Sequence, residues 1–341
     1  MDLDTFFTQL YVLIDDWYKG RPDYHWHGER GADSRLSDSE VVTLALAGQW
    51  RVGVPWQSER GLVRWIQQQG RGLFPSMLGR SAFNARVRQL WGVYIKVQQD
   101  FGALLSSRDD IYLEVDCMPL PAFSNAQALK EAGHWQWESM QGHGGTSSHF
   151  FYGDHLLACV TPSYVVDGWL VGNGDIQDRW LLEAFLSTRA GCPQLQLPPL
   201  NQKRGRHGQA HHHPVGHIGA FQAVGQGQHR PYLADRGLNG QRWRLHWFTA
   251  YHASVISVPP TNAPEIAVWT ATDQRWLASK RQPIETVFAR LCDVFGIKRL
   301  LAHSRWGQYT RIAAKIAAYH LGMVLNELLG RPRGALATLL C

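Results

Sequence analysis

The chain has little cysteine and no long apolar run. Its 341 residues include five cysteines, at positions 117, 159, 192, 292 and 341, and none of them forms a Cys-x-x-Cys pair. This spacing argues against a zinc ribbon and against a disulfide framework, and it suits a reducing cytosol. No apolar stretch is long enough to span a membrane. The apolar N-terminus is interrupted by Asp2, Asp4, Asp15 and Asp16, which a secretory signal would not contain. We therefore expect a cytoplasmic protein.

Negative charge is also in short supply. The sequence has 28 acidic residues against 34 lysines and arginines, which gives a net charge of +6 and a pI near 9.1. Such a balance favours a polyanionic partner. Aliphatic and aromatic residues make up 45% of the chain, so the protein is globular, and its length makes two domains the expected organisation.

Residues 1–108 predict a small helical domain. Apolar residues recur at helical spacing over 1–18, and a further helix is expected over 58–69. Between them, Ser37 and Glu40 form a capping box that opens another helix.

A fourth helix follows, which Ser81 is expected to cap. It carries Arg86 and Arg88, and Arg80 lies just before it. This basic face is either a solvated surface or a DNA-binding surface, because no helix-turn-helix signature identifies a recognition helix.

Residues 109–330 predict an α/β domain with a sheet flanked by helices. Its central strand is expected over 111–117, which is rich in β-branched and aromatic residues and has Asp116 near its end. The proline-containing segment 118–121 is expected to turn the chain out of the sheet. Two apolar runs at 150–160 and 164–171 predict hairpin-connected strands.

Further strands and helices are expected in the second half of this domain. Asp178 opens a helical run, the short strand 232–234 ends at Asp235, and another strand is expected over 254–258. Pro283 suits the first turn of a helix, which places Glu285 in that turn. A long helix is then expected over 306–329, followed by a tail over 331–341.

Residues 193–230 form a basic insert without any acidic residue. Its histidines at 207, 211, 212, 213 and 217 either bind a transition metal or belong to a loop. In the second case, the positive charges of Lys203, Arg204 and Arg206 are candidates for contact with a nucleic-acid backbone.

Three acidic residues stand out as candidates for chemistry: Asp116, Asp235 and Glu285. The first two follow strands, and the dipole of the third one's helix favours a carboxylate in the first turn. Converging carboxylates repel by about 4 kcal/mol per pair at 4 Å, and divalent cations remove that cost. Hard oxygen ligands suit Mg²⁺ or Mn²⁺, and two such ions about 4 Å apart catalyse phosphoryl transfer. The alternative is that the three are unrelated surface acids.

The sequence resembles the DDE transposases of bacterial insertion sequences, which have a ribonuclease H-like core, and it is most similar to the nine-eighty-two group. The similarity spans about residues 1–328 without the insert 193–230. It is carried by five stretches in the same order, at 36–44, 115–121, 155–157, 232–237 and 284–288.

The resemblance implies roles for individual residues. Asp116, Asp235 and Glu285 match the three catalytic, metal-binding acids, which would hold two Mg²⁺ or Mn²⁺ ions. Arg281 matches an arginine one helical turn before the glutamate, a candidate for contact with DNA phosphate. The other candidates for DNA contact are the arginines and the lysine at 80, 86, 88, 203, 204, 206 and 236. One departure from the family is Asp154, which stands where a basic residue is usual.

The resemblance also implies a function. The enzyme would bind the inverted repeats of an insertion sequence, cleave at the element ends and join the 3′-hydroxyl ends to target DNA. It would act as a homodimer on double-stranded DNA, in the cytoplasm and at the nucleoid of a bacterium. Two alternatives stay open: a metal-dependent nuclease of the same fold without strand transfer, and a non-catalytic DNA-binding repressor derived from a transposase.

Overall fold

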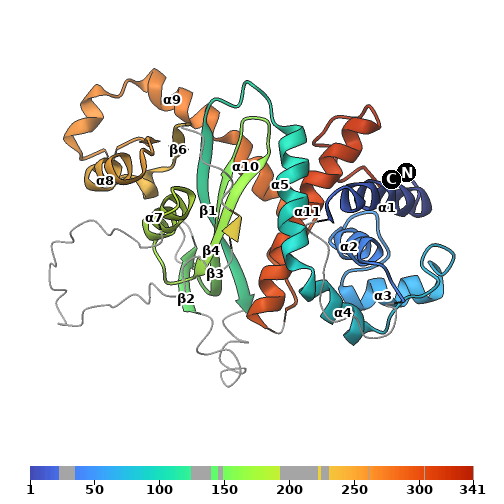
Figure 1. The fold of residues 1–341 in the computed structure, drawn as a ribbon. Helices are drawn as coiled ribbons and strands as arrows, with labels where there is room; N and C mark the ends of the chain where they lie inside the picture. Colours follow the sequence, from blue (N-terminus) through green and yellow to red (C-terminus); the bar gives the residue numbers. More distant parts are fainter. Residues whose placement is uncertain are drawn as a thin grey trace. The chain divides into compact units, whose positions relative to one another are not determined.

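The structure is a computed structural model that describes residues 1–22, 35–123, 140–144, 149–192, 222–223, 230–259, 261–302 and 304–340. The expected α/β class is confirmed, with a mixed sheet and helices (Figure 1). The chain divides into two compact units, one of residues 1–105 and 289–341 and one of residues 106–288. The C-terminal residues thus group with the N-terminal helices, whereas the sequence-based boundaries placed 289–330 with the sheet.

The first unit is helical. Its helices are α1 (Leu3–Lys19), α2 (Asp38–Ala47), α3 (Glu59–Gln68), α4 (Arg80–Gln89), α5 (Trp91–Leu105) and α11 (Arg305–Leu328). Helix α11 packs against α5 and α2, and most of its residues are buried. The C-terminal tail belongs to this core, because Leu336 and Leu339 are buried.

Two expectations about helix starts have different outcomes. The capping box of α2 is confirmed, because the Ser37 hydroxyl accepts the Glu40 amide and the Glu40 carboxylate accepts the Ser37 amide. The expected cap by Ser81 is wrong. Helix α4 begins one residue earlier, at Arg80, and Gly79 precedes it without any side-chain cap.

The second unit contains the sheet. Its strands are β1 (Leu113–Phe123), β2 (Met140–Gly144), β3 (His149–Val160), β4 (Val166–Asn173), β5 (Gln222–Ala223), β6 (Tyr232–Ala234) and β7 (Val255–Ile256). They lie in the order β5-β4-β3-β1-β6-β7, with β2 paired to β3. Strands β1, β3 and β4 run antiparallel, whereas β6 and β7 extend the sheet in parallel to β1. The expected hairpin is thus confirmed as β3–β4.

The central strand is longer than expected. It continues through Pro119 and Pro121 to Phe123, so the predicted turn at 118–121 is wrong. The ladder with β6 ends at Val115, and beyond it β1 is paired only with β3 among the described strands. Proline is tolerated where a strand has a free edge, because its missing N–H removes no ladder hydrogen bond there.

The sheet unit also contains helices and short 3₁₀ turns. These are α7 (Asp178–Arg189), η3 (Arg236–Leu238), α8 (Gln241–Tyr251), η4 (Pro264–Val268) and α9 (Ala271–Lys280); α10 (Gln282–Asp293) begins in this unit and ends in the other. Sequence patterns predicted α7 and α10, including Pro283 in the first turn of α10. They did not predict α8 or α9.

Helices α7 and α8 cover one face of the sheet, and a buried carboxylate of α7 connects them. Glu183 of α7 is fully buried within the apolar cluster of that face. It accepts hydrogen bonds from Trp247 Nε1 at 2.9 Å and from the Tyr251 hydroxyl, and it pairs with His246 Nε2 at 3.0 Å. One side chain thus satisfies three polar groups of α8.

We expect Glu183→Ala to destabilise the protein by about 3–5 kcal/mol, because it removes the carboxylate that accepts hydrogen bonds from the buried Trp247 indole and Tyr251 hydroxyl. The urea unfolding midpoint measures this loss. The matched control is Asp175→Ala, at an exposed position, which should change stability by less than about 0.5 kcal/mol. Equal midpoints for the two variants would contradict the role of Glu183.

Candidate acidic site on the sheet

The register of β1 and β6 brings two of the predicted acids together. The ladder pairs Glu114 with Leu233 and Val115 with Ala234, so one position further on Asp116 lies opposite Asp235. Side chains alternate between the faces of a sheet, which places both aspartates on the face of Glu114 and Leu233. Helix α9 packs on this face, since Leu277 belongs to the cluster of Leu233.

Each aspartate is held by a backbone amide. Asp116 Oδ1 accepts the amide of Cys117 at 2.8 Å. Asp235 caps the 3₁₀ turn η3, where its Oδ1 accepts the Leu238 amide at 3.2 Å. The strand β6 is only three residues long, and this cap ends it at Asp235 as the sequence predicted.

The environment of Asp116 disfavours its charge. Burial, followed by the negative charge of Asp235, raises the pKa of Asp116 to about 6. The guanidinium of Arg281 acts in the opposite direction, because its Nη2 lies 3.1 Å from Asp116 Oδ2. Asp178, the first residue of α7, adds a weaker negative charge. One guanidinium thus faces two neighbouring carboxylates, so a further cation bound there would be favourable.

Sequence reasoning missed Glu114, which connects β1 to α10. Its side chain is fully buried, and Oε2 accepts the Ile284 amide at 2.8 Å. That amide is in the first turn of α10, where backbone N–H groups lack partners within the helix. Alternation along 111–117 gave no signal, because it groups Glu114 with Asp116 on the face opposite Leu113 and Val115, where a carboxylate is expected to face solvent.

The contact of Glu114 with α10 also places Glu285. This exposed residue follows Ile284, and its charge helps to raise the pKa of Glu114. Glu114 and Asp116 are two residues apart on one strand face, about 6.6 Å. Nevertheless, within the described ranges no three histidine, cysteine, aspartate or glutamate side chains gather closely enough to hold a metal ion. The structure therefore gathers the two aspartates and anchors the helix of the third acid beside them.

The predicted DNA-contacting residues have different surroundings. Arg281 pairs with Asp116, and Arg86 pairs with Asp38 and is half-buried. Arg80 and Arg236 are exposed, and Arg88 is half-buried. The insert residues Lys203, Arg204 and Arg206 and the histidine cluster lie outside the described residues, so the choice between metal and loop stays open.

The chain was compared with protein-family models, with curated proteins and with solved structures, and no match was found in any of the three. In the part of the chain that the structure describes, every helix is too short or too polar to cross a membrane.

The pKa of Glu114 predicts how stability depends on pH. Burial raises this pKa from the ordinary value of 4.5 to about 8, with Glu285 adding to it and the Ile284 amide and Arg281 opposing it. A carboxyl with a raised folded-state pKa contributes stability that is complete below pH 4.5 and is lost as pH rises through about 8.

We therefore expect the wild type to lose a few kcal/mol between pH 5 and pH 9, at about 1.4 kcal/mol per pKa unit. Glu114→Gln keeps an acceptor for the Ile284 amide and should lose much less over this range. The measurement is urea unfolding in EDTA at a series of pH values, with Asp175→Asn as the control. If Glu114→Gln and the wild type lose stability in parallel, the buried carboxyl is not the cause.

Proposed function

We propose that the protein is a DDE-type DNA transposase that binds the terminal inverted repeats of an insertion sequence, cleaves at the element ends and joins the 3′-hydroxyl ends to target DNA. The observation that carries this proposal is the β1–β6 register, which sets Asp116 beside Asp235. The five sequence stretches that resemble DDE transposases support it independently.

The strand order supports a ribonuclease H-like core for this proposal. Three antiparallel strands, β1, β3 and β4, are followed by α7, by the short edge strand β5, and then by β6 and β7, which run parallel to β1. In this arrangement the first catalytic acid lies on the central strand and the second follows the adjacent parallel strand. The location of Asp116 on β1, and of Asp235 directly after β6, is compatible with these roles.

The donor set fits a divalent cation of the Mg²⁺ or Mn²⁺ kind. Asp116 and Asp235 offer hard carboxylate oxygens, and the raised pKa of Asp116 reflects burial together with the cost of two adjacent negative charges. Asp116 and Asp235 would hold a first ion, and Glu285 from α10 would complete the site of a second. When bound, such ions lower the pKa of an attacking water and stabilise the leaving oxygen.

The chain's own groups would orient the reacting phosphate. Amide hydrogen bonds fix Asp116 and Asp235, so their oxygens have little freedom to turn away. Arg281 competes with any bound cation for Asp116 Oδ2, and a guanidinium displaced from that oxygen is within one helical turn of Glu285, where it would contact a DNA phosphate. Exposed Arg236, next to Asp235, would contact the backbone of the same strand.

The first unit would supply the other DNA contacts and, with a second copy of the chain, hold two element ends together as a homodimer. Arg80 and Arg88 of α4 are the candidates there. The described pairing of Arg86 with Asp38 assigns that arginine a structural role in free protein.

A strand-transfer assay tests the chemistry. The substrates are oligonucleotides from the inverted repeats beside the gene, with a supercoiled plasmid as target and Mg²⁺ or Mn²⁺ present. Wild type should give joined products, and Asp116→Asn, Asp235→Asn and Glu285→Gln should each lower the rate at least ~100-fold, equivalent to about 2.7 kcal/mol of transition-state stabilisation. Asp175→Asn, at an exposed position outside the site, should retain the wild-type rate.

The alternatives predict other products. Nicks without joined DNA would identify a nuclease of the same fold. Specific DNA binding without cleavage, unchanged by Asp116→Asn, would identify a repressor and reject the enzyme.

Metal binding is testable without DNA. Millimolar Mg²⁺ or Mn²⁺ should raise the melting temperature of the wild type, because a ligand that binds the folded state stabilises it by mass action. Asp116→Asn and Asp235→Asn should show a smaller rise than Asp175→Asn. Equal metal-induced shifts in all four proteins would count against a shared site.

A further inference from the structure

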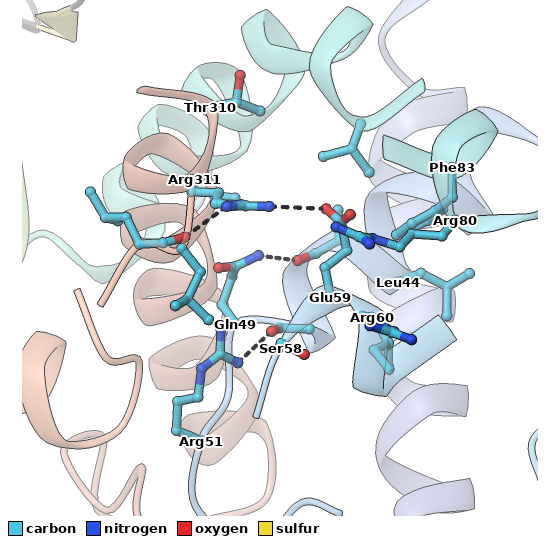
Figure 2. A pocket seen from close by; sticks show the side chains of 17 residues that line it. Leu44, Gln49, Arg51, Ser58, Glu59, Arg60, Arg80, Phe83, Thr310 and Arg311 are labelled. Carbon is cyan, nitrogen blue, oxygen red and sulfur yellow. Dashed lines mark hydrogen bonds and ion pairs between the residues drawn. The ribbon is translucent and has the colours of Figure 1, made fainter. Parts of the chain in front are cut away.

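The helical unit contains two adjoining cavities of about 340 and 350 Å³, and Arg80 and Arg311 line both of them. The first lies between α2, α3, α4 and α11, as the side chains in Figure 2 show. The second lies where α4 and α11 begin. Both volumes are within the range of small-ligand sites, about 300–1,000 Å³.

The two cavities are strongly basic. Five guanidinium groups line them, and one carboxylate does so, that of Glu59. The arginines are Arg51, Arg60, Arg80, Arg88 and Arg311. Among the described residues, the second cavity has arginines and small polar side chains but no acid in its lining. A concave surface lined by charges of one sign concentrates the opposite ion.

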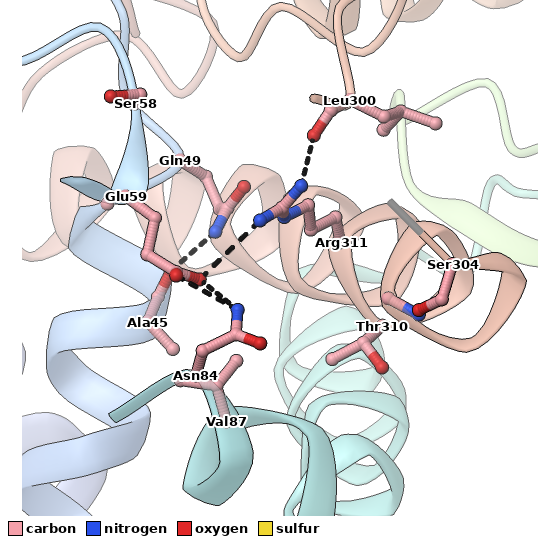
Figure 3. A network of polar contacts seen from close by, with 12 residues as sticks. Ala45, Gln49, Ser58, Glu59, Asn84, Val87, Leu300, Ser304, Thr310 and Arg311 are labelled. Carbon is pink, nitrogen blue, oxygen red and sulfur yellow. Dashed lines mark hydrogen bonds and ion pairs between the residues drawn. The ribbon is translucent and has the colours of Figure 1, made fainter. Parts of the chain in front are cut away.

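The carboxylate of Glu59 is the counter-charge of Arg311. Its two oxygens accept hydrogen bonds from Asn84 at 2.9 and 2.8 Å, and Arg311 Nη2 lies 3.7 Å away (Figure 3). Arg311 also donates to the Leu300 carbonyl at 2.8 Å. Arg80 and Arg88 form no ion pair with any described residue, so their charges are uncompensated.

Burial disfavours the charged forms of two of these arginines, and the neighbouring guanidinium groups add to this effect. Burial lowers the pKa of Arg311, Glu59 opposes this, and the charges of Arg80 and Arg88 lower the pKa further by a smaller amount. Burial, Arg311 and Arg299 lower the pKa of Arg51 to about 10. Bringing an anion into the cavities would relieve this repulsion.

Two helix N-termini add positive potential at the second cavity. Arg80 and Ser81 belong to the first turn of α4, which has no side-chain cap. Ser304 caps α11, and Gly307 of its first turn also lines the cavity. Free N–H groups and the helix dipole at such ends favour phosphate oxygens.

We propose that the second cavity is a phosphate-binding site in which Arg80 and Arg88 bind the phosphate oxygens, Arg311 adds positive charge from the cavity wall, and the start of α4 donates backbone N–H groups. With the proposed function, on which this assignment of the source rests, the phosphate belongs to a DNA backbone. A guanidinium pair matches phosphate geometry well, because each fork can donate two parallel hydrogen bonds.

DNA binding tests the backbone as the source. Fluorescence anisotropy with a labelled duplex, repeated over a range of salt concentrations, should give a lower affinity for Arg80→Gln/Arg88→Gln, by at least ~10-fold. The slope of log affinity against log salt should become shallower by about 0.9 for each DNA phosphate that the variant no longer neutralises. Arg64→Gln, on the exposed face of α3, is the matched control and should leave both values unchanged. Glu59→Gln should raise affinity, because it removes the one counter-charge.

Free phosphate tests the site itself. Inorganic phosphate should raise the melting temperature of the wild type and of Arg64→Gln by at least ~2 °C over chloride at equal ionic strength. Arg80→Gln/Arg88→Gln should lack this rise while melting normally in chloride, which shows that it folds.

The outcomes separate the possible sources. Loss of both effects in the double variant supports a DNA phosphate, and loss of the phosphate effect with unchanged DNA binding supports a free phosphate ligand. Unchanged behaviour in both assays overturns the proposal. Because phosphate stabilisation does not require cleavage, the site stands even where the strand-transfer assay rejects a transposase.

Discussion

The pairing of β1 with β6 is the constraint on which the candidate site depends. Only three residues of β6 join the ladder, yet they fix the register that sets Asp116 opposite Asp235. A shift by one residue would turn one aspartate to the opposite face, because side chains alternate along a strand. Tyr232 and Ala234 pack into the cluster under α7 and α8, while Leu233 packs under α9, so burial on both faces specifies this register.

The same strand also places α10. Glu114 is buried with a raised pKa, which is an unfavourable position for a carboxyl unless it makes compensating contacts. The amide of Ile284 supplies one, and it fixes the start of α10 at the strand that carries Asp116. Glu114 thus lowers the stability of the fold at high pH, but it also positions the helix that carries Glu285.

Local patterns predicted the elements whose signals are local. The capping box at Ser37, the short strand before Asp235 and the first turn at Pro283 were all found from adjacent residues. The continuation of β1 through Pro119 was not, because proline signals a turn except at a free strand edge, and that edge depends on where β6 stops. Only part of the site could be predicted from the sequence, for the same reason. Acids at strand ends follow from local patterns, but the role of Glu114 depends on a helix 170 residues away.

Each unit contains a cluster of like charges, which is acidic in the sheet unit and basic in the helical unit. In the sheet, Asp116 and Asp235 lie together with Arg281 as their nearby cation, and burial raises the pKa of Asp116. In the helical unit, several arginines lie near Glu59, and burial, with a smaller effect of Arg80 and Arg88, lowers the pKa of Arg311. Folded proteins rarely keep like charges together without a partner, since the repulsion opposes folding. A cation at the acids and a phosphate at the arginines would relieve the repulsion in each unit, and the proposed transposase would meet both kinds of ligand.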